Sequence, residues 1–101
     1  MKHFIPVTNF HLRMGKTKSH IDCPIAKALR DSVIGANHDV VVYQSDTIIN
    51  ESYFVHSDKL RKLINEIDEI SARKSIVDYI QPFELVVYME NPEGRIVLRE
   101  E

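Results

Sequence analysis

An apolar stripe at helical spacing is the feature that most constrains how this chain can fold. The stripe lies within residues 57–72, where Ser57 is placed to cap a helix. Its members recur every three or four residues: Leu60, Leu63, Ile64, Ile67 and Ile70. Two pairs of opposite charge at i,i+4 add support: Asp58–Lys62 and Glu69–Arg73. We favour a helix that packs on a sheet over one that docks in a partner's groove.

A β-hairpin is predicted near the C-terminus, because apolar residues alternate with other residues in two neighbouring segments. The first strand starts at Phe83 and the second covers residues 95–99. The segment 91–94 between them has the composition of a type I turn, with Gly94 where a positive φ is needed. Residues 100–101 are expected to fray.

The N-terminal half shows shorter elements with clear end signals. Residues 4–7 are predicted to form a strand, and Pro6 places it at a sheet edge. Thr8 can cap a brief helix that ends at Gly15 in a left-handed conformation. Further along, we expect a strand over 40–43, a turn at 45–46 and a returning strand over 47–49.

A second well-marked helix is predicted over residues 22–34. Asp22 is a good N-cap, and Pro24 falls in the first turn, where its missing N–H removes no helical hydrogen bond. Gly35 and Asn37 end it. One face is apolar: Ile25, Ala28, Leu29 and Val33.

These elements predict an α+β fold in a single domain, residues 1–101, with a small, mainly antiparallel sheet and two or three helices packed on one face. Helices 22–34 and 57–72 would cover that face. Val86, Tyr88 and Val97 would then form an apolar patch on the opposite face. Self-association would cover the patch, so a homodimer is predicted.

Composition excludes several classes of protein. The single cysteine allows no intramolecular disulfide, and the N-terminus lacks a charged and then apolar leader. Apolar runs are far shorter than the ~20 residues that cross a bilayer, so no membrane contact is expected. We therefore expect a soluble cytoplasmic protein.

Basic residues concentrate in one part of a chain whose net charge is −2. Residues 13–30 carry five Lys or Arg residues and one acidic residue, Asp22. The candidate anion- or partner-binding residues are Arg13, Lys16, Thr17, Lys18, Ser19, His20 and Cys23. They surround the helix start at 22–25, an arrangement that favours anions, although Asp22 competes for the same N–H groups. A solvated loop that happens to be basic is the simpler interpretation.

A nucleotide-hydrolysing site is rejected. Gly15-Lys16-Thr17 matches the end of a P-loop, but Phe10 stands where that motif requires its first glycine. Nucleic-acid binding is possible but not favoured, because the second half is acidic and the tyrosines do not alternate with basic residues. An acidic face that imitates nucleic acid is weaker still at this net charge.

Cys23 admits three interpretations. A thiol in the first turn of a helix beside cations can be a nucleophile, with His20 as its base. A lone cysteine is more often a small packed residue, which we favour. His20 and Cys23 supply two zinc ligands, but no second pair has matching spacing, so neither a metal nor a cofactor is predicted.

Two motifs resemble a family of small phage and prophage proteins. Residues 7–15 match a V-T-x-x-H-[IL]-x-x-G segment, and residues 23–29 match a C-P-[IV]-A-x-A-[LI] helix. A later strand opens with Pro82-Phe83, although Leu85 stands where the family tends to have Phe. The resemblance implies a virus- or prophage-encoded accessory protein that acts in the host cytoplasm without catalytic residues.

Two functions are therefore carried forward from the sequence. The first is a non-enzymatic protein-binding module that modulates a host or phage macromolecule. The alternative is phosphate or nucleic-acid binding through the basic loop 13–20 and the helix start at 22–25.

Overall fold

A computed structural model describes residues 2–90 and 94–99 of the chain. Within these residues there are six strands and three α-helices, so the fold is α+β, as predicted. The strands are β1 (Lys2–Val7), β2 (Val40–Val42), β3 (Asp46–Ile49), β4 (Ser52–His56), β5 (Phe83–Tyr88) and β6 (Gly94–Leu98). The helices are α1 (Asn9–Met14), α2 (Pro24–Arg30) and α3 (Asp58–Glu69), with a 3₁₀ turn at Ile76–Asp78. No helix among the described residues is long and apolar enough to cross a membrane.

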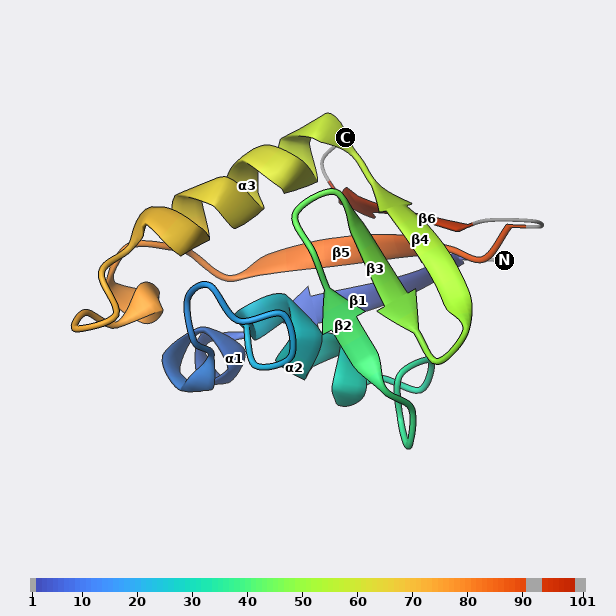
Figure 1. The fold of residues 1–101 in the computed structure, drawn as a ribbon, viewed down its shortest axis with the longest axis horizontal. Helices are drawn as coiled ribbons and strands as arrows, with labels where there is room; N and C mark the ends of the chain where they lie inside the picture. Colours follow the sequence, from blue (N-terminus) through green and yellow to red (C-terminus); the bar gives the residue numbers. More distant parts are fainter. Residues whose placement is uncertain (1, 91–93, 100–101) are drawn as a thin grey trace.

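The described strands form one sheet in the order β1-β5-β6-β4-β3-β2. Its neighbours run antiparallel except β4 and β6, which run parallel with Phe54 opposite Gly94. The prediction of a mainly antiparallel sheet is therefore wrong: the sheet is mixed. It also curls into a half-barrel, so that β2 and β3 cross β1 and β5 steeply (Figure 1).

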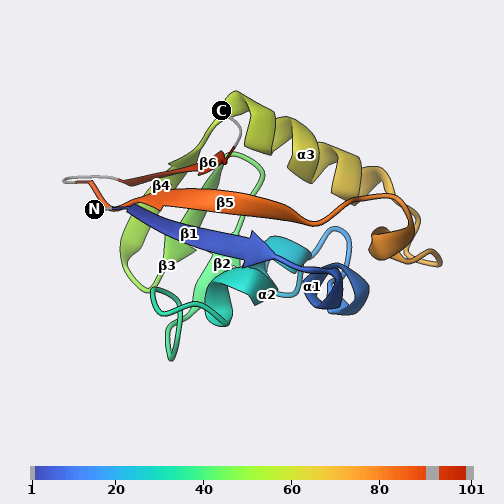
Figure 2. The same cartoon turned by 180° about the vertical axis from the view of Figure 1, so that it is seen from behind.

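Helix α2 lies between the two edges of this curled sheet and contacts both β1 and β2 (Figure 2). Five of its residues are buried: Pro24, Ile25, Ala26, Ala28 and Leu29. A helix that is buried on most of its surface must present small side chains wherever a strand comes close. The two alanines meet that requirement, and Ala26 is fully buried.

The ends of α2 differ from the prediction. Cys23 is the N-cap, and the helix stops at Arg30, so the predicted span 22–34 is wrong at both ends. The carboxylate of Asp22 faces Lys27 at 3.9 Å and Arg30 at 3.5 Å instead of the helix N–H groups. Ser32 Oγ donates to the carbonyl of Leu29 at 2.6 Å, and the chain turns away there.

Helix α3 follows the predicted pattern at its start. Ser57 is its N-cap, with Oγ accepting from the Leu60 N–H at 3.2 Å. The helix ends at Glu69 rather than at residue 72, because Ile70 is extended. Arg73 therefore lies outside the helix, and Asp58 pairs with Arg61 rather than with Lys62. The residues that face the core are Leu60, Ile64 and Ile67.

The predicted edge strand and the predicted cap of the first helix are confirmed, whereas the positive φ predicted for two glycines is wrong. Strand β1 lies at a sheet edge, and Thr8 caps α1. Gly15 has a φ of −73°, so it is not left-handed. Gly94 has no positive φ either; a Cβ there would lie 2.5 Å from the ring of Phe54, so close packing requires this glycine. The predicted turn residues 91–93 and the frayed end at 100–101 lie outside the described residues.

Strand β4 is an element that the sequence analysis did not predict, and it carries the buried His56. Its Nδ1 lies 2.9 Å from the carbonyl of Gln44, so Nδ1 carries the proton and donates. Its Nε2 then accepts from the hydroxyl of Thr47 at 2.6 Å. Both ring nitrogens are satisfied in the neutral form, and burial lowers the pKa of His56 below its usual 6.5.

We expect Ala26→Leu to lower the free energy of unfolding by about 1–3 kcal/mol, because the added atoms have no room between the sheet edges. Urea unfolding measures the change. Ala72→Leu makes the same substitution at an exposed position and is expected to have an effect within about 0.5 kcal/mol. Equal effects of the two substitutions would contradict the tight packing of α2.

The free energy of unfolding is expected to fall as the pH drops below about 6.5. In the unfolded chain His56 protonates near that value, whereas burial keeps it neutral in the folded chain. The unfolded state therefore binds more protons, until the folded imidazole also protonates at lower pH. Urea unfolding at about pH 7.5 and about pH 5 should show a steeper loss for the wild type than for His56→Gln. A parallel loss in both proteins would contradict this role.

Candidate functional site

The predicted basic loop lies between strand β2 and the C-terminal end of α3. The N–H of Val42 donates to the carbonyl of His20 at 2.7 Å, and His20 Nδ1 lies 3.0 Å from the carbonyl of Val42. The N–H of Lys18 donates to Asp68 Oδ1 at 2.9 Å. These contacts tie the loop to the sheet on one side and to α3 on the other.

The loop keeps its cations exposed but uses several of its other polar groups internally. Arg13, Lys16, Lys18 and His20 are exposed. Lys18 is left-handed, with φ of 56°, and the carboxylate of Asp68 already occupies its N–H. Ser19 Oγ accepts from the Asp22 N–H at 2.9 Å, and Thr17 is half-buried. The exposed lysines remain available to an anion, and the hypothesis of anion binding here stays a prediction.

Cys23 is buried rather than presented to solvent at the start of α2. Its side chain is 8% exposed, and its Sγ accepts from the Ala26 N–H at 3.4 Å. Burial raises the pKa of this thiol above its usual value, and the N–H bonds only partly offset the rise. His20, the proposed base, lies against Val42 and packs on Tyr43 at 4.7 Å between ring centres. These contacts favour a packed, helix-capping thiol over a nucleophile.

The structure shows a polar cluster of Thr8, His11 and Asp31 that sequence reasoning missed. The Thr8 N–H donates to His11 Nδ1 at 3.0 Å, so Nε2 carries the proton and donates to Asp31 Oδ2 at 2.7 Å. The Thr8 hydroxyl lies 3.1 Å from Nδ1. Because the Nδ1 lone pair already accepts the backbone N–H, His11 cannot serve Thr8 as a base. The cluster caps α1 and ties it to the end of α2; the T-x-x-H spacing was the available signal.

The residues predicted to form an oligomer patch lie on the outer face of the sheet. Val86 stands between Phe4 and Val97 on the neighbouring strands and is only 4% exposed. The expectation that Val86 belongs to an exposed patch is therefore wrong. Tyr88 is half-buried beneath the guanidinium of Arg95, which lies 4.2 Å from its ring centre. Burial of Val86 removes the centre of the expected patch, and a homodimer through this face stays a prediction.

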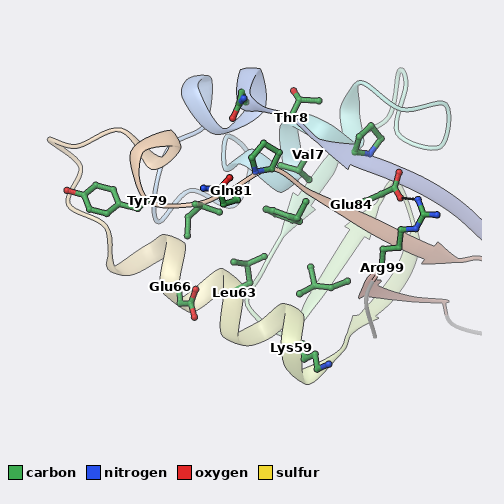
Figure 3. Close-up of a pocket in the computed structure, with 15 residues that line it drawn as sticks. Val7, Thr8, Lys59, Leu63, Glu66, Tyr79, Gln81, Glu84 and Arg99 are labelled. Carbon is green, nitrogen blue, oxygen red and sulfur yellow. Dashed lines mark hydrogen bonds and ion pairs between the residues drawn. The ribbon is translucent and has the colours of Figure 1, made fainter.

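A groove lies between α3 and the start of β5 (Figure 3). Its volume is about 880 Å³. Four half-buried apolar side chains line it: Leu63, Ile80, Phe83 and Leu98. Tyr79 stands at one end and is 55% exposed. Half-buried apolar side chains around an open cavity are typical of a binding surface.

One face of α3 forms a wall of this groove. Lys59, Leu63 and Glu66 line it at i, i+4 and i+7. A second cavity of about 460 Å³ continues along the helix past Glu69 and Ile70. The two cavities share Glu66, Tyr79 and Ile80 as lining residues. The signal in the sequence was the width of the apolar stripe, because the half-buried Leu63 and Ile70 extend it beyond the fully buried residues.

The groove combines apolar side chains with a few charged and polar ones. The residues that line its larger cavity include neither histidine nor cysteine. Glu84 is engaged in an ion pair with Arg99 across the neighbouring strands. Among the described residues no three His, Cys, Asp or Glu side chains lie close enough together to hold a metal ion. The remaining polar groups stand at the rim, where they can orient a bound chain.

Comparison with models of protein families, with curated proteins and with solved structures finds no significant match to this chain.

We expect Cys23 to react slowly with thiol reagents in the folded protein, because its raised pKa and its burial both disfavour the reactive thiolate. Reaction with a chromogenic disulfide at about pH 8 measures the rate, and unfolding in urea should accelerate it by at least about 10-fold. A rate in the native protein equal to that of the unfolded chain, or thiolate formation below neutral pH, would contradict the packed assignment.

Proposed function

We propose that this chain is a non-enzymatic module that binds a segment of another protein in the groove between α3 and β5. The observation that carries the proposal is the row of half-buried apolar side chains around an open cavity of about 880 Å³. That volume falls within the range of roughly 300–1,000 Å³ found for ligand sites.

Burial of these side chains by a partner supplies the binding free energy. Leu63 and Phe83 are only half-buried in the isolated chain, so each still exposes apolar area to water. Tyr79 adds an aromatic ring whose large exposed area a partner can cover. Tyrosine is also one of the residues that contribute most to protein interfaces.

The resemblance to phage and prophage proteins supplies the expected setting. It implies an accessory protein that binds a macromolecule of the phage or of its bacterial host, in the host cytoplasm. Such a role requires no cofactor and no reacting group, so the groove is compatible with it.

Phosphate or nucleic-acid binding through the loop is the alternative, supported by the exposure of Lys16 and Lys18. Two observations make it the weaker proposal. The residues at the helix start that would have completed the anion site, Cys23 and Pro24, are themselves buried. Asp68 also places a negative charge against the loop backbone.

Truncation of Tyr79 tests the groove directly. Tyr79→Ala is expected to reduce the recovery of a specific partner from bacterial or phage-infected lysate by at least about 10-fold, because an interface tyrosine is often a dominant contact. Affinity capture with quantitative mass spectrometry measures the recovery. Tyr79 is largely exposed, so the variant should fold normally.

Two further variants complete this experiment. Tyr43→Ala truncates an exposed tyrosine away from the groove and is expected to retain the partner. Lys16→Glu with Lys18→Glu tests the loop. If only the lysine variant loses binding of the partner or of nucleic acid, and that binding weakens steeply with salt, anion binding by the loop replaces the groove as the proposed function. Equal recovery with Tyr79→Ala and the wild type would also reject the groove.

A further inference from the structure

We infer that the segment bound in this groove carries a lysine or arginine next to its apolar residues, with the basic side chain at the Glu66–Glu69 end. The inference rests on the proposed function and specifies the chemistry of the partner. Three features of the groove lead to it: two carboxylates without an ion pair in the described part of the chain, the polarity of α3 and the length of the groove.

Two carboxylates stand at one end of the groove. Glu66 lines both cavities and Glu69 lines the second, and both side chains are exposed. They are three residues apart on α3, so they lie on neighbouring turns of the same side of the helix. Residues 2–90 and 94–99 contain no ion pair to either carboxylate.

The lysines nearest this end, Lys62 on α3 and Lys74, make no ion pair with either glutamate among the described residues. Lys74 lines the same cavity, but its Nζ lies 5.6 Å from the centre of the Tyr79 ring and makes no ion pair with the glutamates. Asp68, also on α3, is held by the N–H of Lys18. The last turn of α3 has no basic residue, so the negative end of the helix dipole adds to the carboxylates.

The opposite end of the groove has the opposite character. Lys59 lines it in the first turn of α3, where the helix dipole is positive. The charge of Arg99 is paired with Glu84. The apolar side chains lie between these ends, so the groove presents a cation, an apolar middle and two carboxylates in that order along α3. A segment with complementary order binds in one direction only.

The length of the groove sets the size of the segment. It follows α3 from Lys59 to Ile70, which at the helical rise is roughly 16 Å. An extended chain covers that distance with about five residues. A segment of this length holds two or three apolar side chains facing the groove and one terminal basic side chain.

Selection from a displayed library of random 12-residue peptides on the immobilised full chain tests the inference. We expect enriched peptides to combine apolar residues with a lysine or arginine and to lose binding to Tyr79→Ala. For a synthetic copy of an enriched peptide, Glu66→Gln with Glu69→Gln should weaken the affinity by about 10-fold, as expected for a charge-assisted contact. The same peptide with its basic residue replaced by glutamine should bind the wild type and the Glu66→Gln, Glu69→Gln variant with equal affinity. Glu51→Gln with Asp39→Asn removes two exposed acids outside the groove and should have no effect.

The outcomes separate the inference from the proposed function. Two results overturn the inference and leave the groove as a binding site. The first is that enriched peptides depend on Tyr79 but lack a basic residue. The second is that they bind the Glu66→Gln, Glu69→Gln variant as tightly as the wild type. Failure to enrich any peptide whose binding depends on Tyr79 overturns both.

Discussion

The position of α2 between the two edges of the sheet is the constraint on which the rest of the structure depends. Strands β1 and β2 stand at opposite ends of the strand order, yet both contact this helix. Only a curled sheet can bring them to the same helix. The approach requires small residues: Ala26 and Ala28 in the helix itself, and Gly15 before it, where a Cβ would lie 2.6 Å from the Pro24 nitrogen. Small side chains in this short segment therefore allow both sheet edges to approach the helix.

The groove follows from the way α3 packs on the sheet. Helix α3 packs on β6, and Leu60, Ile64 and Ile67 provide its contact with the core. Its apolar stripe is wider than this contact, so Leu63 and Ile70 remain half-buried along one side. The residues before β5 form the other wall without closing over the helix (Figure 3). An amphipathic helix can thus contribute to the core and to a binding surface at once, through faces about 100° apart.

The features that sequence reasoning identified correctly are those with short-range causes. Thr8 and Ser57 cap their helices because a hydroxyl reaches an N–H three residues on. The hairpin of β5 and β6 follows from alternation and a short connection. Strand β4 forms a hairpin with β3 across Asn50 and Glu51, so this local signal was available and was missed. Its parallel pairing with β6 joins segments about forty residues apart, which no local pattern reveals. Cys23 was placed correctly at a helix start, but its burial depends on the strands that surround α2.

The sequence by itself determined the α+β class, the N-caps of α1 and α3, the edge position of β1 and the location of the basic loop. Each of these depends on backbone hydrogen bonds and side-chain spacing within a few residues. The tertiary structure alone decided that the sheet is mixed and curled, that Val86 is buried, and that one face of α3 borders a groove. Those properties arise where segments distant in the sequence pack against the same apolar surface. They depend on the shapes and volumes of side chains from several segments, which no single segment contains.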